Sequence, residues 1–233
     1  MPSEHFTKSF IQSIRPNTRN IINRIRLIGN NQKIFCIGLN KTGTTSIKKA
    51  MQHLGFIVGN QAEAQNLLKP WLKRDFQPII NYCKYAQAFQ DSPFSFPYTY
   101  IPLDQAFPNS KFILTIRDDA EQWYSSITRF HGKKWSNGAI PTKNDLLNAV
   151  NGTKGRPWIV NRALFCTPEE DPYQKEKLIA FYNNYIHDVK QYFKYRTEDL
   201  LIINVANEDS YLKFCEFLGK SPIEKRFPWE NKT

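Results

Sequence analysis

The sequence predicts a single α/β domain built around a central parallel sheet of five strands. From residue 33 onward, short apolar runs alternate with segments of helical periodicity, the pattern of a parallel sheet covered by helices on both faces. The chain has 233 residues, 41% of them hydrophobic, which is enough to bury a substantial core. A loop of glycine and threonine joins the first apolar run to the first predicted helix.

The predicted strands are short and apolar, as expected for strands buried on both faces. We expect them at residues 33–37, 56–58, 85–90, 111–116 and 200–205. Helices are predicted between them at residues 44–54, 62–71, 78–83 and 173–193. The last of these carries apolar side chains three and four positions apart, which is typical of a helix packed on a core.

Residues 131–168 show little periodicity, and glycine and proline recur among them. Loops of this length inside a compact domain are typically lids or binding loops. We therefore expect residues 61–81 and 131–168 to shape a substrate pocket. Large aromatic side chains in or beside these segments are candidates to line it, with simple packing as the alternative: Trp71, Trp135, Trp158 and Tyr173.

Residues 1–32 form a basic arm in front of the predicted domain. Glu4 is its one acidic residue, and apolar side chains recur at helical intervals on both sides of Pro16. Three interpretations stay open: an extra helix packed on the domain, a helix on an anionic membrane surface, or a targeting segment. Basic residues gather here, at Lys8, Arg15, Arg19, Arg24 and Arg26.

The overall charge predicts an anionic partner. Lys and Arg number 32 against 21 Asp and Glu, a formal net charge of +11. No apolar run approaches the roughly 20 residues of a membrane span, and no secretory core opens the chain. The cysteines are far apart, without metal-site spacing, so we expect reduced and mostly buried thiols and a cytoplasmic location: Cys36, Cys83, Cys166 and Cys215.

The loop after the first strand is the most informative stretch of the sequence. It reads Gly38-Leu-Asn-Lys-Thr-Gly-Thr-Thr-Ser46 and leads directly into a helix. Gly43 permits a tight turn, so that the amides of residues 42–45 face one point at the positive end of the helix dipole. Hydroxyl groups add donors and Lys41 adds a cation. The loop therefore predicts an anion site.

The position of the lysine argues against magnesium-dependent use of ATP. Gly38 and Gly43 keep the spacing of the phosphate-binding loop GxxxxGK[ST], but Thr44 stands where that loop has its lysine. Lys41 comes two residues before Gly43 instead. A metal-dependent phosphotransferase on the same fold nevertheless stays an alternative, and so does a basic module for nucleic acid or membrane that keeps a vestigial nucleotide loop.

The loop resembles that of sulfotransferases that use 3′-phosphoadenosine 5′-phosphosulfate, abbreviated PAPS. In that family the 5′-phosphosulfate is bound by a lysine, a serine or threonine, a glycine and two further hydroxyl residues, in that order. Residues 41–45 match this order. The resemblance implies that Lys41 contacts the oxygen bridging phosphate and sulfate. It also implies a 5′-phosphate site made by Thr42, Gly43, Thr44, Thr45 and Ser46.

A second stretch matches the same family. Members of the family bind the 3′-phosphate with an arginine at a strand end and a serine eight residues later. Arg117 and Ser125 have this spacing. Arg117 follows a predicted buried strand at the edge where parallel sheets bind ligands, and its guanidinium suits a phosphate. An ion pair with Asp118, Asp119 or Glu121 is the alternative use of Arg117.

The resemblance covers about residues 33–231 and implies a three-layer fold like that of P-loop nucleotide kinases. We accordingly divide the chain into the arm, 1–32, and a sulfotransferase domain, 33–233. Stretches such as Asp91-Ser-Pro93 match small soluble members. The chain departs from many cytosolic members at Ser46, where they have an adenine-stacking tryptophan, and it lacks their carboxyl-terminal Arg-Lys-Gly element.

The expected reaction is sulfuryl transfer from PAPS to a hydroxyl or amine of a small molecule. It needs a cation at the bridging oxygen, which is the predicted role of Lys41, and a base for the acceptor proton. Asp91, after a strand end, and His131, beside the irregular stretch, are the candidate bases. We expect no metal and no nucleic-acid partner, while membrane contact through the arm and the oligomeric state stay open.

Overall fold

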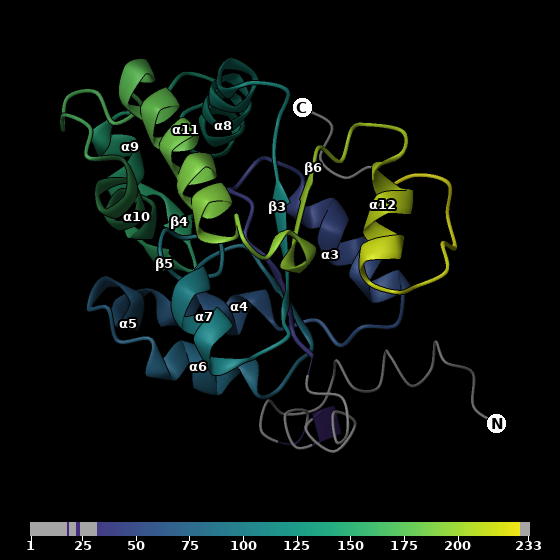
Figure 1. Cartoon of the computed structure of the whole chain (residues 1–233). Coiled ribbons are helices and arrows are strands. Elements are labelled where there is room, and N and C mark those ends of the chain that lie inside the picture. The colour runs from purple at the N-terminus through teal and green to yellow at the C-terminus, as the bar shows by residue number, and fades with distance from the viewer. Residues whose placement is uncertain (1–17, 19–21, 24–31, 229–233) are drawn as a thin grey trace.

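The structure is a computed structural model that describes residues 18, 22–23 and 32–228. The predicted arm, with its proposed membrane contact, lies almost entirely outside the described residues. The described chain forms a central parallel sheet between two groups of helices (Figure 1). None of its helices is both long and apolar enough to cross a bilayer.

The sheet has four strands, not the five predicted. Their order is β2 (Ala88–Gln90), β1 (Ile34–Cys36), β3 (Lys111–Thr115) and β6 (Leu200–Ile203), and all three pairings are parallel. The predicted strand at 56–58 is reduced to a single bridge between Val58 and Ala88. The chain leaves the sheet there because the Asn60 side chain caps the next helix, accepting hydrogen bonds from the amides of Ala62 and Glu63.

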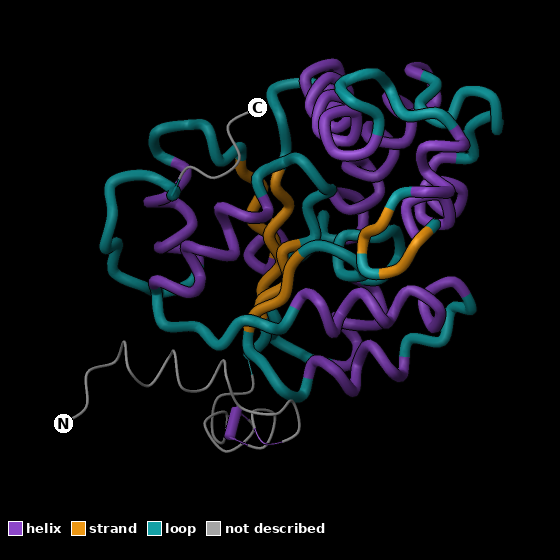
Figure 2. Tube along the Cα trace, turned by 180° about the vertical axis from the view of Figure 1, so that it is seen from behind, coloured by secondary structure: helices purple, strands orange, loops and turns teal. Residues whose placement is uncertain are grey.

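Alternate strand residues face opposite sides of the sheet and build two cores. Phe35, Phe112 and Leu114 pack on one side, under α6 (Gln77–Cys83), α7 (Tyr100–Ala106), α8 (Ala120–Trp135) and α11 (Lys175–Tyr192). Cys36 and Ile113 pack on the other, under α3 (Thr44–His53) and α12 (Ser210–Phe217). Figure 2 shows the strands edge-on between these layers, so the domain has the three layers that the sequence predicts.

The remaining elements lie around the larger helical layer. The predicted helix 62–71 is three short pieces, α4 (Gln61–Ala64), η1 (Gln65–Leu67) and α5 (Leu68–Leu72), and η2 (Thr197–Asp199) precedes β6. Three of the cysteines are buried as predicted, and Cys166 is exposed.

Residues 131–168 are regular structure rather than the long loop predicted. They hold the end of α8, then α9 (Lys143–Asn148), a hairpin of β4 (Val150–Asn151) and β5 (Thr153–Lys154), and α10 (Arg156–Phe165). Local signals explain these short elements: Thr142 and Asp145 form a capping box at the start of α9, and Gly155, with a φ of 74°, starts α10. The helices are too short for their periodicity to stand out in the sequence.

Candidate active site

The loop after β1 presents unpaired amides at the start of α3. Gly43 is the helix N-cap, with a φ of 104°, and no side chain caps the helix. The amides of Thr44, Thr45 and Ser46 therefore lack the intrahelical partners that later residues have. Together with the helix dipole they form an anion site.

Hydrogen bonds within the loop and to β3, α8 and α11 hold this loop in place. The Thr42 hydroxyl lies 2.5 Å from both the Leu39 carbonyl oxygen and the Thr115 hydroxyl. Trp123 Nε1 of α8 donates to the Asn40 carbonyl at 2.9 Å, and the Tyr185 hydroxyl of α11 donates to the Ile37 carbonyl at 2.6 Å. These contacts order the loop before any ligand binds, which lowers the entropic cost of binding.

Arg117 reaches the loop from the end of β3. Its Nε donates to the Lys41 carbonyl oxygen at 2.7 Å, and its amide donates to the Tyr182 hydroxyl at 2.8 Å. Among the described residues no carboxylate lies within ion-pair distance of Arg117, so the alternative of an ion pair with its acidic neighbours is not realised. Its guanidinium is thus available to a ligand.

Lys41 stands over an aromatic ring at the edge of this site. Its Nζ lies 3.8 Å from the centroid of the Phe130 ring. Burial, with a smaller effect of the Arg117 charge, lowers the pKa of Lys41 to about 8. Burial likewise lowers the pKa of Arg117. An anion bound beside Lys41 and Arg117 would favour the charged forms of both side chains.

These groups surround a pocket of about 110 Å³, called the loop pocket below. Its walls come from the ends of β1, β2 and β3 and from α3 and α8: Asn40, Lys41, Gly43, Thr44, Thr45, Ser46, Asp91, Arg117, Phe130 and His131. The predicted anion loop and Arg117 are therefore brought together. Thr42 is buried behind the loop, where it braces Leu39 and Thr115.

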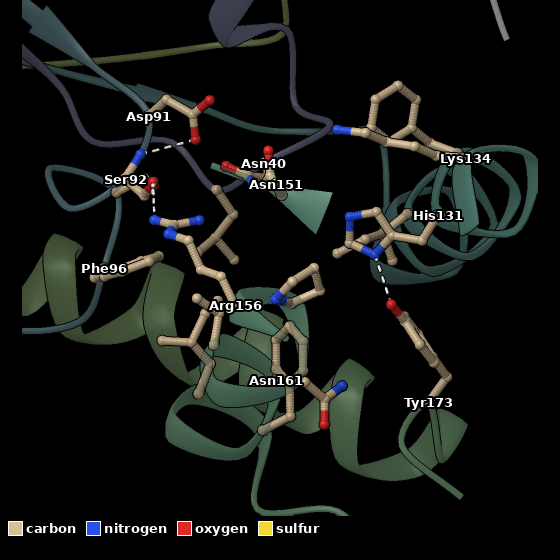
Figure 3. Close-up of a pocket in the computed structure, with 18 of the residues that line it drawn as sticks. Asn40, Asp91, Ser92, Phe96, His131, Lys134, Asn151, Arg156, Asn161 and Tyr173 are labelled. Carbon is tan, nitrogen blue, oxygen red and sulfur yellow. Dashed lines mark hydrogen bonds between the residues drawn. The ribbon is translucent and has the colours of Figure 1, made fainter. Parts of the chain in front are cut away.

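A second pocket, of about 190 Å³, adjoins the first and is called the aromatic pocket below (Figure 3). Apolar side chains from α8, α10 and α11 form a large part of its wall, including Trp123, Trp135, Phe165 and Phe181. The two pockets share four residues, which are Asn40, Asp91, Phe130 and His131. A small molecule in the aromatic pocket would consequently lie next to a ligand in the loop pocket.

The family follows from comparison with known proteins. A family model described as a sulfotransferase domain matches residues 33–233. The chain belongs to this sulfotransferase family. A search of curated proteins found no match.

Two ionisable groups of this sulfotransferase stand where its two pockets meet. Asp91 lies just beyond β2, where its carboxylate accepts a hydrogen bond from the Ser92 amide at 2.8 Å. Burial raises the pKa of Asp91, against the lowering effects of that bond and of nearby cations. A carboxyl group of raised pKa is a better base than an ordinary aspartate.

His131, on α8, is held by aromatic partners. Its Nδ1 lies 2.7 Å from the Tyr173 hydroxyl, and its ring stacks on Trp135 with centroids 4.3 Å apart. Burial lowers the pKa of His131 to about 3, helped by the charges of Lys134 and Lys41. The imidazole is therefore neutral at physiological pH, and Nε2 is the ring nitrogen left for a substrate.

The other predicted residues divide between the aromatic pocket and positions outside both pockets. Ser125 is exposed on α8 and does not line the loop pocket, so its role at a 3′-phosphate stays a prediction. Trp135 and Tyr173 line the aromatic pocket as predicted, whereas Trp71 and Trp158 do not. Trp71 is instead buried against Phe96.

Sequence reasoning missed two polar residues of the aromatic pocket. Arg156 and Asn161 of α10 are buried in its wall, 6% and 3% exposed respectively. A charged residue that follows Gly155 in a stretch without periodicity is expected on the surface. No local sequence signal indicates that Arg156 is buried. Within the described residues no cluster of three or more metal-ligating side chains occurs.

Proposed function

We propose that this sulfotransferase moves the sulfuryl group of PAPS to a hydroxyl or amine of a small molecule and releases adenosine 3′,5′-bisphosphate. The observation that carries the proposal is the convergence of Arg117 and the amides of α3 on one pocket from two separate strands. A molecule with two phosphates on one adenosine matches two groups of anion-binding donors that come from separate strands. A triphosphate bound in an ordinary phosphate-binding loop does not require the second of these groups, the arginine.

On the donor side, the amides of residues 44–46 would hold the 5′-phosphate, and Arg117 would hold the 3′-phosphate. Lys41 lines the loop pocket beside Phe130, which belongs to both pockets. In the transfer the acceptor oxygen or nitrogen bonds to sulfur while the bond from sulfur to the bridging oxygen breaks. Lys41 stabilises the charge that develops on that oxygen.

The acceptor loses a proton in this reaction. Asp91 and His131 both line the junction of the pockets, so either can receive the proton from a bound acceptor. The low pKa of His131 makes it a weak base in the empty site. An anionic donor beside Lys41 offsets one of the cations that depress it, and so raises the pKa of His131 towards its ordinary value.

The test is a calorimetric titration of the protein with adenosine 3′,5′-bisphosphate in the presence of EDTA. We expect binding without metal, and a loss of at least about tenfold in affinity in Arg117→Ala, since charge-assisted hydrogen bonds contribute about 1.5–3 kcal/mol. Arg129→Ala removes an exposed arginine of α8 and is the matched control. Formation of sulfated product from PAPS then tests the transfer.

The alternatives give different results. Binding of ATP that requires Mg²⁺, with none of the bisphosphate, would identify a phosphotransferase. Binding to nucleic acid or anionic vesicles that falls steeply with salt and ignores Lys41 would identify a basic binding module.

A further inference from the structure

The wall of the aromatic pocket contains a buried arginine with unused hydrogen-bond donors. Arg156 is 6% exposed, and its Nη2 donates to the Ser92 hydroxyl at 3.1 Å. Its Nε is buried and has no hydrogen-bond partner. Among the described residues no carboxylate forms an ion pair with it, and Asp91 acts on it only at longer range.

Two further polar atoms of the same wall lack partners. Asn161 is fixed by a hydrogen bond from its Nδ2 to the Pro172 carbonyl oxygen at 2.7 Å, which leaves its Oδ1 buried and unpaired. Trp135 Nε1 is also buried and unpaired. Buried polar atoms without partners are rare in folded proteins, and each is costly. Of the three, the guanidinium of Arg156 is the costliest to leave without an ion pair, because it is charged, and it indicates that a polar group of a ligand completes the site.

The charges of the pocket wall indicate whether the polar group of the ligand is an anion or a cation. Among the described residues that line the aromatic pocket, Asp91 is the one carboxylate, against the cations Arg156 and Lys134. A guanidinium removed from water and without an ion pair is unfavourable, and an anion that accepts two of its N–H groups compensates that cost. The expected group is therefore a carboxylate. Figure 3 shows Arg156 extending from α10 towards Ser92, apart from His131 and Tyr173.

The size of the cavity limits the rest of the molecule. A cavity of about 150 Å³ lined by apolar side chains accommodates benzene. The aromatic pocket, at about 190 Å³, therefore takes one ring with a short substituent. Its wall of Trp123, Phe165 and Phe181 suits the faces and edges of such a ring.

We propose that the acceptor is a compact apolar alcohol or phenol that carries a carboxylate, with the carboxylate bound by Arg156 and the hydroxyl directed to His131. This proposal rests on the proposed function for the reaction at the hydroxyl, but binding of the carboxylate by Arg156 can be measured without any transfer. It names a determinant of acceptor choice that lies apart from the donor-binding loop.

The experiment compares three probes of similar shape: 4-hydroxyphenylacetate, its neutral amide, and the cation tyramine. Each is titrated into the protein saturated with adenosine 3′,5′-bisphosphate. We expect the acid to bind at least about tenfold more tightly than the amide, a difference of about 1.4 kcal/mol, and tyramine to bind more weakly than the amide. Equal binding of acid and amide, or no binding of the acid at millimolar concentration, overturns the proposal.

Variants then assign the effect to one residue. Arg156→Gln should abolish the preference for the acid and leave the affinity for adenosine 3′,5′-bisphosphate within about twofold, because Arg156 does not line the loop pocket. Arg162→Gln removes a charge from the same helix at a side chain bonded to Thr167, outside the pocket, and should keep the preference. An unchanged preference in Arg156→Gln overturns the assignment.

Failure of the proposed function has a separate signature. If the bisphosphate does not bind to the wild-type protein, the donor assignment is wrong, and the three probes are titrated into the free protein instead. The comparison of acid, amide and cation needs no variant. It therefore tests the carboxylate site even where Arg156→Gln does not fold.

Discussion

Replacement of His131 should make the protein less sensitive to acid. The pKa of His131 is lowered from 6.5 to about 3, first by burial and then by the charges of Lys134 and Lys41. The unfolded chain therefore binds a proton at this residue between these values, whereas the folded chain does not. A depressed pKa of a base contributes stability that is present above pH 6.5 and is lost as the pH falls towards 3.

The size of the effect follows from the two pKa values. At about pH 5 the unfolded histidine is 1.5 pH units below its pKa and almost fully protonated, which favours unfolding by roughly 2 kcal/mol relative to about pH 8. This value is a ceiling, because His131 lines both pockets and water there reduces the cost of its charge. We therefore expect His131→Gln to lose up to about 2 kcal/mol less than the wild type over this range.

Urea unfolding at about pH 8 and about pH 5, followed by tryptophan fluorescence, measures this difference. The same measurement on His187→Gln is the control, since His187 is exposed on α11. Equal losses of stability in the wild type and His131→Gln would refute the reasoning, because they would show that His131 is charged in the folded protein at pH 5. A shift in the control of the same size would place the effect in the unfolded chain.

Two further results are expected. Gly38→Ala should lower the free energy of unfolding by at least about 2 kcal/mol in urea, because its Cβ would lie 1.9 Å from Thr115 Oγ1 and 2.7 Å from the Thr115 amide nitrogen. Gly55→Ala is the control, because a Cβ there meets nothing within 4 Å and only the φ of +86° is unfavourable. It should lower the free energy of unfolding by only about 1 kcal/mol. Equal losses in the two variants would contradict the steric argument. The affinity for adenosine 3′,5′-bisphosphate should fall by up to about twentyfold between about pH 7.5 and about pH 9.5, because Lys41 loses its charge above its pKa of about 8. Lys41→Arg should flatten this dependence, and a flat wild-type profile would remove Lys41 from the anion site.

Local signals were sufficient to predict that the loop after β1 and Arg117 line one pocket. Gly43 and the residues around it specify a tight turn between a buried strand and a helix, and the structure has Gly43 at the start of α3. Arg117 follows β3, and parallel strands place their carboxyl ends at one edge, so its proximity to the loop followed from the order of the elements. These predictions needed no knowledge of side-chain packing.

The fifth strand and the acceptor side depended on contacts distant in the sequence. Residues 56–58 have the composition of a strand, but the cap formed by Asn60 ends the pairing after Val58. Arg156 is buried because α10 packs beside α11 and against the segment after β2, where it meets Ser92, 64 residues away. A burial that depends on such a contact leaves no periodic signal, so Arg156 could not be predicted as a residue of the aromatic pocket.

The two pockets are coupled through the charges that surround their shared wall. Burial is the main cause of the lowered pKa values of His131 and Lys41. The charges of Lys134 and Lys41 lower the pKa of His131 further, and that of Arg117 lowers the pKa of Lys41 further, so cations of the empty site repel one another. An anion in the loop pocket relieves this repulsion and makes the shared wall more basic. The repulsion between these cations therefore attracts anions to the loop pocket. It also makes the basicity of His131 depend on whether the loop pocket is occupied.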